Sequence, residues 1–194
     1  MRRPGSKQRR LVILLLALLT FGLAYYAGNK HKDPDLPVIS GILLHPPTTV
    51  PEFALTDQQG EPFSAGRLLG RWSLIVLDPA PGTRSPAFIR LVQVHNRLAA
   101  EQQQQRQTHF IYLPREGSDE IDAAVERLGE GFYALSGGAS EIAAAFRHFG
   151  VETIRNGFTL YLVGPQARMQ ALFTDAQDAA TIAVDLQTLT THQR

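Results

Sequence analysis

The feature that most constrains the fold of this chain is an apolar run at residues 74–77, followed by a short loop and a helix start. The run Leu-Ile-Val-Leu predicts a strand that is buried on both faces of a sheet. Ser85 and Pro86 then predict a helix N-terminus, because serine is a favoured N-cap and proline is favoured at the first helical position. In α/β folds, a strand, a tight loop and a helix N-terminus commonly carry a binding site.

Strand and helix patterns alternate through the rest of the chain. Strands are expected within residues 53–60, 72–77, 109–113, 132–135, 158–163 and 169–174. Helices are expected over residues 86–101, 118–128, 140–149 and 178–189, with Ser118 and Ser140 as the N-caps of the second and third. This order predicts an α/β fold with a single mixed sheet and helices on both of its faces.

The N-terminus carries an apolar run without charge over residues 11–27, preceded by arginine and lysine residues. At about 1.5 Å per residue, a helix of this length covers most of a roughly 30 Å hydrocarbon core. Tyr25 and Tyr26 stand where the interfacial aromatic residues of a spanning helix lie. We therefore expect a basic cytoplasmic segment over residues 1–10 and an uncleaved transmembrane signal anchor over residues 11–28. A cleaved signal peptide is the alternative, although the two tyrosines interrupt the small-residue spacing of a cleavage site.

The next segment, residues 29–50, is expected to be a Pro-rich linker. Its prolines disfavour a regular helix and favour extended backbone. Within it, residues 39–44 are apolar enough to lie against the domain as an additional edge segment. The globular domain is expected over residues 51–194.

The composition excludes several functions. The sequence contains no cysteine, which excludes a thiol nucleophile, a disulfide and a thiolate-ligated metal. The net charge is only +1, and no basic face interleaved with aromatic residues follows the N-terminal cluster, so nucleic acid is not an expected partner. None of the six histidines pairs with another at a metal-ligand spacing. We therefore expect no cofactor and no metal.

Several motifs resemble the Sco/SenC family, the thioredoxin-like copper-assembly proteins of cytochrome c oxidase. The resemblance covers roughly residues 41–190. It rests on the N-terminal anchor and linker, on the segment Phe53-Ala-Leu-Thr-Asp-Gln-Gln-Gly-Glu-Pro-Phe63, and on Leu69-Gly-Arg-Trp72 leading into the central strand. It implies a thioredoxin-like fold with a mixed central sheet flanked by helices, and a role linked to a respiratory oxidase.

The copper ligands of that family are two cysteines in a Cys-x-x-x-Cys-Pro loop and a later histidine. The resemblance places Pro81 and Ser85 at the two cysteine positions and Asn156 at the histidine position. Proline offers no ligand atom, and serine and asparagine oxygens are too hard for Cu(I). The chain therefore resembles a degenerate member that has lost copper binding and thiol–disulfide exchange.

The same loop is also a candidate partner surface, formed by Asp78, Gly82, Thr83 and Arg84. Arg84 and the free N–H groups at the helix start suit an anion or a partner carboxylate, whereas Asp78 is expected to make turn contacts. Ser85 lacks the Gly-x-Ser-x-Gly context of a hydrolase nucleophile, and its expected role is that of an N-cap.

Two function classes follow. The first is a non-catalytic accessory protein that assists cytochrome c oxidase assembly by binding oxidase subunits or other assembly factors. It would be anchored in the bacterial inner membrane by one helix, with its N-terminus in the cytoplasm and its domain in the periplasm. The second is a metal-binding protein or thioredoxin-like enzyme with non-cysteine ligands, for which His95, His109 and His148 are the candidates. The absence of thiols favours the first class, and the chain is not expected to be an enzyme.

Overall fold

The computed structural model describes residues 15–25, 36–99, 102–151 and 157–192. The chain forms two units, Met1–Pro37 and Val38–Arg194. In the first unit, residues 15–25 are helical. The predicted basic segment and both ends of the predicted anchor lie outside the described residues. Within the described ranges, no helix combines the length and the apolar character needed to cross a membrane.

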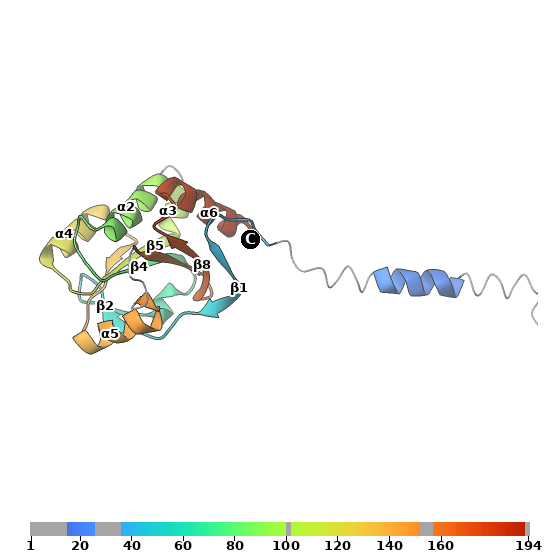
Figure 1. Ribbon diagram of the computed structural model, residues 1–194, viewed down its shortest axis with the longest axis horizontal. Coiled ribbons are helices and arrows are strands. Elements are labelled where there is room, and N and C mark those ends of the chain that lie inside the picture. The colour runs from blue at the N-terminus through green and yellow to red at the C-terminus, as the bar shows by residue number, and fades with distance from the viewer. Residues whose placement is uncertain (1–14, 26–35, 100–101, 152–156, 193–194) are drawn as a thin grey trace, which may run out of the picture. The chain divides into compact units, whose positions relative to one another are not determined.

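The second unit contains a six-stranded sheet in the order β1-β8-β7-β4-β5-β6 (Figure 1). Its strands are β1 (Ile42–Thr49), β4 (Trp72–Asp78), β5 (Thr108–Pro114), β6 (Phe132–Ala134), β7 (Thr159–Gly164) and β8 (Arg168–Thr174). β4, β5 and β6 run parallel, whereas β7, β8 and β1 pair antiparallel. Every residue of β4 is buried, which confirms the predicted central strand. The parallel pairing of β4 with β5 and its antiparallel pairing with β7 confirm the predicted mixed sheet.

Helices cover both faces of the sheet (Figure 1). Side chains of α2 (Pro86–Leu98), α4 (Asp119–Leu128) and α6 (Ala179–His192) share one apolar cluster with Leu74 and Val76 of β4. The alternate residues, Ile75 and Leu77, pack on the other face with α5 (Ala139–His148). That face also carries the hairpin of β2 (Ala54–Thr56) and β3 (Pro62–Ser64) and the short 3₁₀ helix η1 (Ala65–Leu68), while α3 (Gln102–Arg106) follows α2.

Strand β1 lies inside the region that was predicted to be linker, and it confirms the prediction that residues 39–44 lie against the domain as an additional edge segment. It pairs antiparallel with β8, with Ile42 opposite Leu172. The carboxylate of Asp185, on α6, accepts the backbone N–H groups of Ser40 (2.8 Å) and Gly41 (3.1 Å). The compact domain therefore begins at Val38 rather than at residue 51. Prolines exclude a helix, but they are tolerated in an edge strand, and this is why the linker was predicted to be too long.

Of the three predicted N-caps, two are correct and one is wrong. Ser118 caps α4 by accepting the N–H of Ile121 at 3.4 Å, and Ser85 caps α2. Ser140 was predicted to cap α5, but that helix begins at Ala139 with Gly138 as its N-cap. The side chain of Glu141 reaches back to accept the N–H of Gly138 at 2.8 Å, which stabilises this earlier start.

The contact of Gly41 with the sheet gives a test of the β1 arrangement. A Cβ atom at this position would lie 2.5 Å from two ring carbons of Phe173 and 2.8 Å from the carbonyl oxygen of Leu172. Phe173 is fully buried and has no space to retreat. We expect Gly41→Ala to lower the free energy of unfolding by about 1–3 kcal/mol, as overpacking does. Urea unfolding of the full chain in detergent, followed by the fluorescence of the single tryptophan, measures it.

Gly66→Ala is the matched control. A Cβ at Gly66 meets one heavy atom within 4 Å, at 3.6 Å, which is an ordinary contact. If the two variants were equally stable, β1 would not lie against β8 as described.

Candidate functional site

The loop predicted to carry the site joins the end of β4 to the start of α2 and is organised by Asp78. This residue is only 4% exposed. Its Oδ1 accepts the backbone N–H of Ala80 at 3.0 Å, and its Oδ2 accepts the hydroxyl of Tyr112 at 2.7 Å. The hydroxyl of Ser85 also donates to Oδ2. The expected turn contact of Asp78 is present, but most of its hydrogen bonding is to distant side chains.

Ser85 uses its hydroxyl group in two directions. The oxygen accepts the backbone N–H of Phe88 at 3.1 Å, which confirms Ser85 as the N-cap of α2, and the hydrogen is donated to Asp78. The residue is 8% exposed. The hydroxyl is buried and its oxygen already caps the helix, so the contacts of Ser85 are those of a structural residue.

Tyr112 was not predicted as a site residue. It lies on β5, which is parallel to β4, and it is fully buried. Its hydroxyl donates to Asp78 and accepts the backbone N–H of Gly82 at 3.3 Å. Burial, reinforced by the hydrogen bond to Asp78, raises the pKa of Tyr112 well above its usual value, so the hydroxyl stays protonated and remains a donor. The sequence signal was a tyrosine within an apolar strand, since a buried tyrosine hydroxyl needs a partner.

The Asp78 network is the set of hydrogen bonds that joins Asp78, Ala80, Gly82, Ser85 and Tyr112. It places a carboxylate beside the N-terminus of α2, whose first turn contains no acidic residue. The positive end of the helix dipole and the three donors compensate the buried charge. Within the part of the chain that the structure describes, the only ion pair joins Arg67 to Asp57, so Asp78 depends on these neutral donors.

The predicted partner surface is smaller than expected. Asp78 is buried and cannot contact a partner directly, which corrects its assignment to that surface. Gly82 and Thr83 are half-buried, and the hydroxyl of Thr83 donates to Glu120 of α4 at 2.6 Å. Arg84 is exposed, as are Pro79 and Ala80. The most exposed residues of the loop are therefore Pro79, Ala80 and Arg84.

The three positions assigned to the lost copper ligands are only partly described. Pro81 is half-buried in the loop, and Ser85 belongs to the Asp78 network. Asn156 lies outside the described residues.

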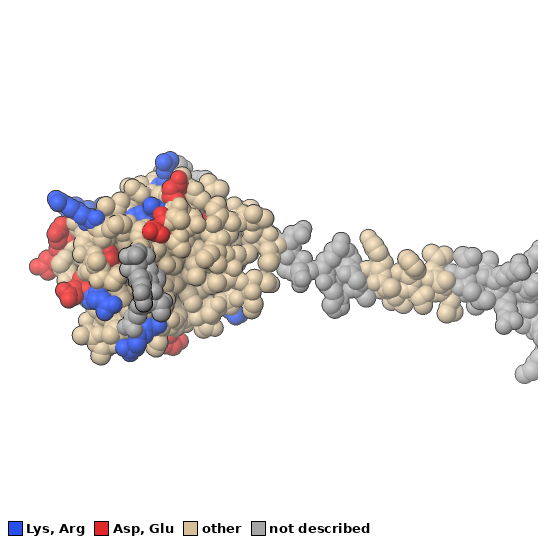
Figure 2. All heavy atoms as spheres, viewed as in Figure 1, with Lys and Arg blue, Asp and Glu red and all other residues tan. Residues whose placement is uncertain are grey.

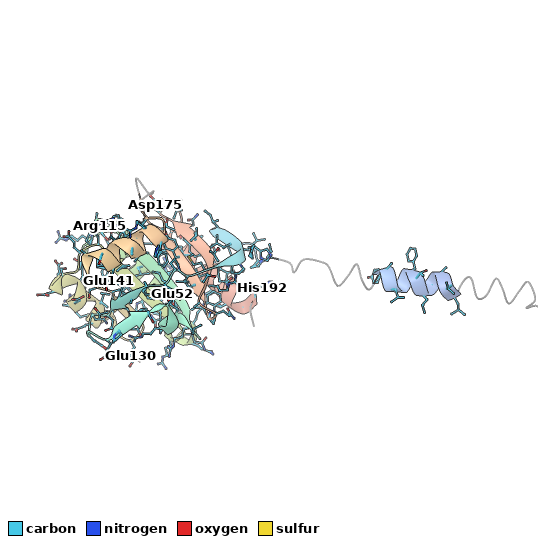
Figure 3. All side chains as sticks on the ribbon, turned by 90° about the horizontal axis from the view of Figure 1, so that it is seen from below. Glu52, Arg115, Glu130, Glu141, Asp175 and His192 are labelled. Carbon is cyan, nitrogen blue, oxygen red and sulfur yellow. The ribbon has the colours of Figure 1, made fainter. Side chains whose placement is uncertain are left out.

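Arg115, which follows β5, extends over α5, with its guanidinium carbon 4.6 Å from the centre of the Phe146 ring (Figure 3).

The histidines that were considered as alternative ligands are not brought together. His95, on α2, packs edge-on against Phe110, with ring centres 5.0 Å apart, and burial lowers its pKa. His109 precedes Phe110 on β5, so its side chain points to the opposite face of the sheet, where it packs against Tyr133. His148 is exposed on α5. Across the described ranges, no group of three or more histidine, aspartate or glutamate side chains is placed to hold a metal ion.

The surroundings of His109 keep it neutral. Burial, followed by the positive charges of Arg71 and Arg67, lowers its pKa to about 4. It is an uncharged core residue at neutral pH.

Comparison with known proteins identifies the family. A family model described as SCO1/SenC matches residues 44–191, which is most of the chain. This chain belongs to the SCO1/SenC family. With no cysteine in its 194 residues, it is a degenerate SCO1/SenC member, because it cannot contain a Cys-x-x-x-Cys loop. Among curated proteins, no sequence matches it significantly.

Solved structures support the same fold at low sequence identity. Copper-bound yeast Sco1 is 17% identical, with a TM-score of 0.58 over 76% of this chain and 93% of that chain. Copper-bound ScoI of Bradyrhizobium japonicum is 20% identical, with a TM-score of 0.56 over 72% and 98%. BsSco, described as a Sco-family cytochrome c oxidase assembly protein with a disulfide switch, is 15% identical, with a TM-score of 0.61 over 80% and 99%. The predicted thioredoxin-like fold is confirmed.

Removal of the Tyr112 hydroxyl tests the Asp78 network. Tyr112→Phe keeps the buried ring but deletes the group that joins Asp78 to Gly82. We expect a loss of about 1–3 kcal/mol in unfolding free energy, since buried polar groups lose a partner. We also expect faster hydrogen exchange at the Gly82 amide. Tyr133→Phe is the control, because Tyr133 is half-buried and lies outside the network; equal effects of the two substitutions would contradict the role of Tyr112.

Proposed function

We propose that this SCO1/SenC member is a non-catalytic accessory protein that assists cytochrome c oxidase assembly by protein–protein interaction. The observation that carries the proposal is the Asp78 network. Where the family resemblance implies thiolates, this chain has a serine hydroxyl bonded to a buried carboxylate and a proline without a ligand atom.

The donor set in the loop does not fit the copper chemistry of the family. Copper sites of this kind need thiolate and imidazole ligands, whereas the network offers hydroxyl and carboxylate oxygens. Those oxygens already use their hydrogen-bonding capacity on one another and on backbone N–H groups. Thiol–disulfide exchange needs a thiolate, which no residue of this chain supplies.

The exposed part of the loop is the proposed contact with oxidase subunits or other assembly factors. Arg84 offers a guanidinium group that pairs well with a partner carboxylate. Hydrogen bonds of the Asp78 network and the Thr83–Glu120 bond hold the flanking backbone in place. A surface that is ordered before binding loses less conformational entropy when the partner arrives.

Membrane attachment completes the proposal. The charge-free apolar run and the basic residues before it support a single anchor over residues 11–28, with the N-terminus in the cytoplasm and the domain in the periplasm of a bacterial inner membrane. An anchor of this kind keeps the domain near membrane-embedded subunits and raises their effective concentration.

Copper titration tests the proposal against the metal-binding alternative. We expect the metal-free full chain in detergent to form no stoichiometric complex with Cu(I) or Cu(II) in the presence of a competing chelator. The variant Pro81→Cys/Ser85→Cys/Asn156→His restores the three ligand types and serves as the positive control. A one-to-one complex of the unmodified chain that survives the chelator would favour a metal carrier with non-cysteine ligands.

The loop contact is tested by charge reversal at Arg84. We expect Arg84→Glu to reduce the recovery of oxidase subunits or assembly factors several-fold when the full chain is purified from membranes. Arg147→Glu is the control, because Arg147 is an exposed arginine on α5. Unchanged recovery with Arg84→Glu would remove the loop from the proposed interface.

A further inference from the structure

Two buried polar atoms in the core have no hydrogen-bond partner among the protein groups that the structure describes. They are the hydroxyl oxygen of Ser73, on β4, and the Nδ1 atom of His109, on β5. Ser73 is fully buried, and His109 is 7% exposed. Buried polar groups in proteins nearly always have a partner, because a donor or acceptor that leaves water without one loses its hydration uncompensated.

The two side chains are neighbours. Ser73 lies directly opposite His109 in the parallel pairing of β4 with β5, which are adjacent in the sheet (Figure 1). Residues two positions apart in a strand share a face, and Ile75 and Ile111, two positions further along, both belong to the apolar cluster that contains η1 and α5. Ser73 and His109 therefore point into the same layer of the core, and a single partner can serve both.

The third member of this row across the sheet is Val163 of β7, which lies opposite Ser73 on its other side. Serine has the smallest side chain of the three. The layer is therefore least filled above Ser73, next to the imidazole, and this is where a small partner would lie. Ser73 is fully buried, so such a partner is enclosed in the core rather than bound at the surface.

The charged groups around His109 already have other partners. Arg67 pairs with Asp57 at 2.9 Å, and the guanidinium of Arg71 donates to the backbone carbonyl of Arg106 at 2.9 Å. Burial, followed by the charges of Arg71 and Arg67, lowers the pKa of His109, so its imidazole is neutral. A neutral imidazole has one nitrogen that donates and one that accepts, and a hydroxyl group does both. A water molecule also does both, so it can bond to Ser73 and to either tautomer of His109.

We propose that one internal water molecule bridges the Ser73 hydroxyl and Nδ1 of His109. Buried waters in proteins typically join polar groups that would otherwise lack a partner. Both residues stand second in their strands, so the bridge links β4 to β5 at the end of the sheet opposite to the Asp78 network. The two central parallel strands are thus joined by side-chain hydrogen bonds at both ends.

A crystal structure of the full chain, at a resolution that shows ordered waters, tests the proposal. We expect one water within about 3 Å of both the Ser73 oxygen and Nδ1 of His109. We expect Ser73→Val to lose this water and the matched variant Ser73→Thr to keep it, because threonine has nearly the shape of valine but retains the hydroxyl. A direct hydrogen bond between Ser73 and His109 overturns the proposal, as does the absence of any water between them. The unmodified chain alone decides the question if Ser73→Val does not fold.

The side-chain nitrogen resonances of His109 give a second measurement, in solution. The full chain is labelled with ¹⁵N-histidine and held in detergent micelles, and the signals of His109 are those that disappear in His109→Gln. We expect Ser73→Val to shift the Nδ1 resonance and Ser73→Thr to leave it close to that of the unmodified chain. Ser140→Val is the control, because Ser140 is exposed on α5. An Nδ1 resonance that Ser73→Val leaves unchanged would also overturn the bridge.

Discussion

The buried carboxylate of Asp78 is the interaction on which the candidate site depends. It lies at the end of a fully buried strand, where an uncompensated charge would be costly. This cost is offset by hydrogen bonds that Asp78 accepts from Tyr112 on the neighbouring strand, from Ser85 at the start of α2 and from the backbone of Ala80. These contacts connect β4, β5, the loop and α2, so that the conformation of the loop follows from the need to satisfy one charge.

The same network explains how a SCO1/SenC scaffold remains ordered without cysteines. Ser85 takes the position that the family resemblance gives to a thiol, and it contributes both a helix cap and a hydrogen bond to the carboxylate. The dipole of α2, which would otherwise attract an external anion, is complemented by a carboxylate of the chain itself. The site is filled by its own side chains, and binding through the exposed loop is the function that we propose for it.

Charged side chains gather over the part of the domain that carries α4 and α5 (Figure 2), and the first segment of the domain lies away from them. The strand β1 and the Asp185 hydrogen bonds attach this first segment to the sheet and to α6. Any pull on the N-terminal segment is therefore transmitted to the core rather than to a loose linker.

The sequence by itself determined the order of the main elements from β4 to α6, the buried central strand, the Ser85 cap and the absence of thiol chemistry, because these follow from local periodicity, capping preferences and composition. Only the tertiary structure decided the rest. Tyr112 meets Asp78 across 34 residues, and His95 and His109 face opposite sides of the sheet. Ser40 lies in the segment that was predicted to pack along the edge of the domain, but its partner Asp185 lies 145 residues away. Such pairings depend on strand register and chain crossover, which set the neighbours of a side chain and leave no mark in the local pattern of residues.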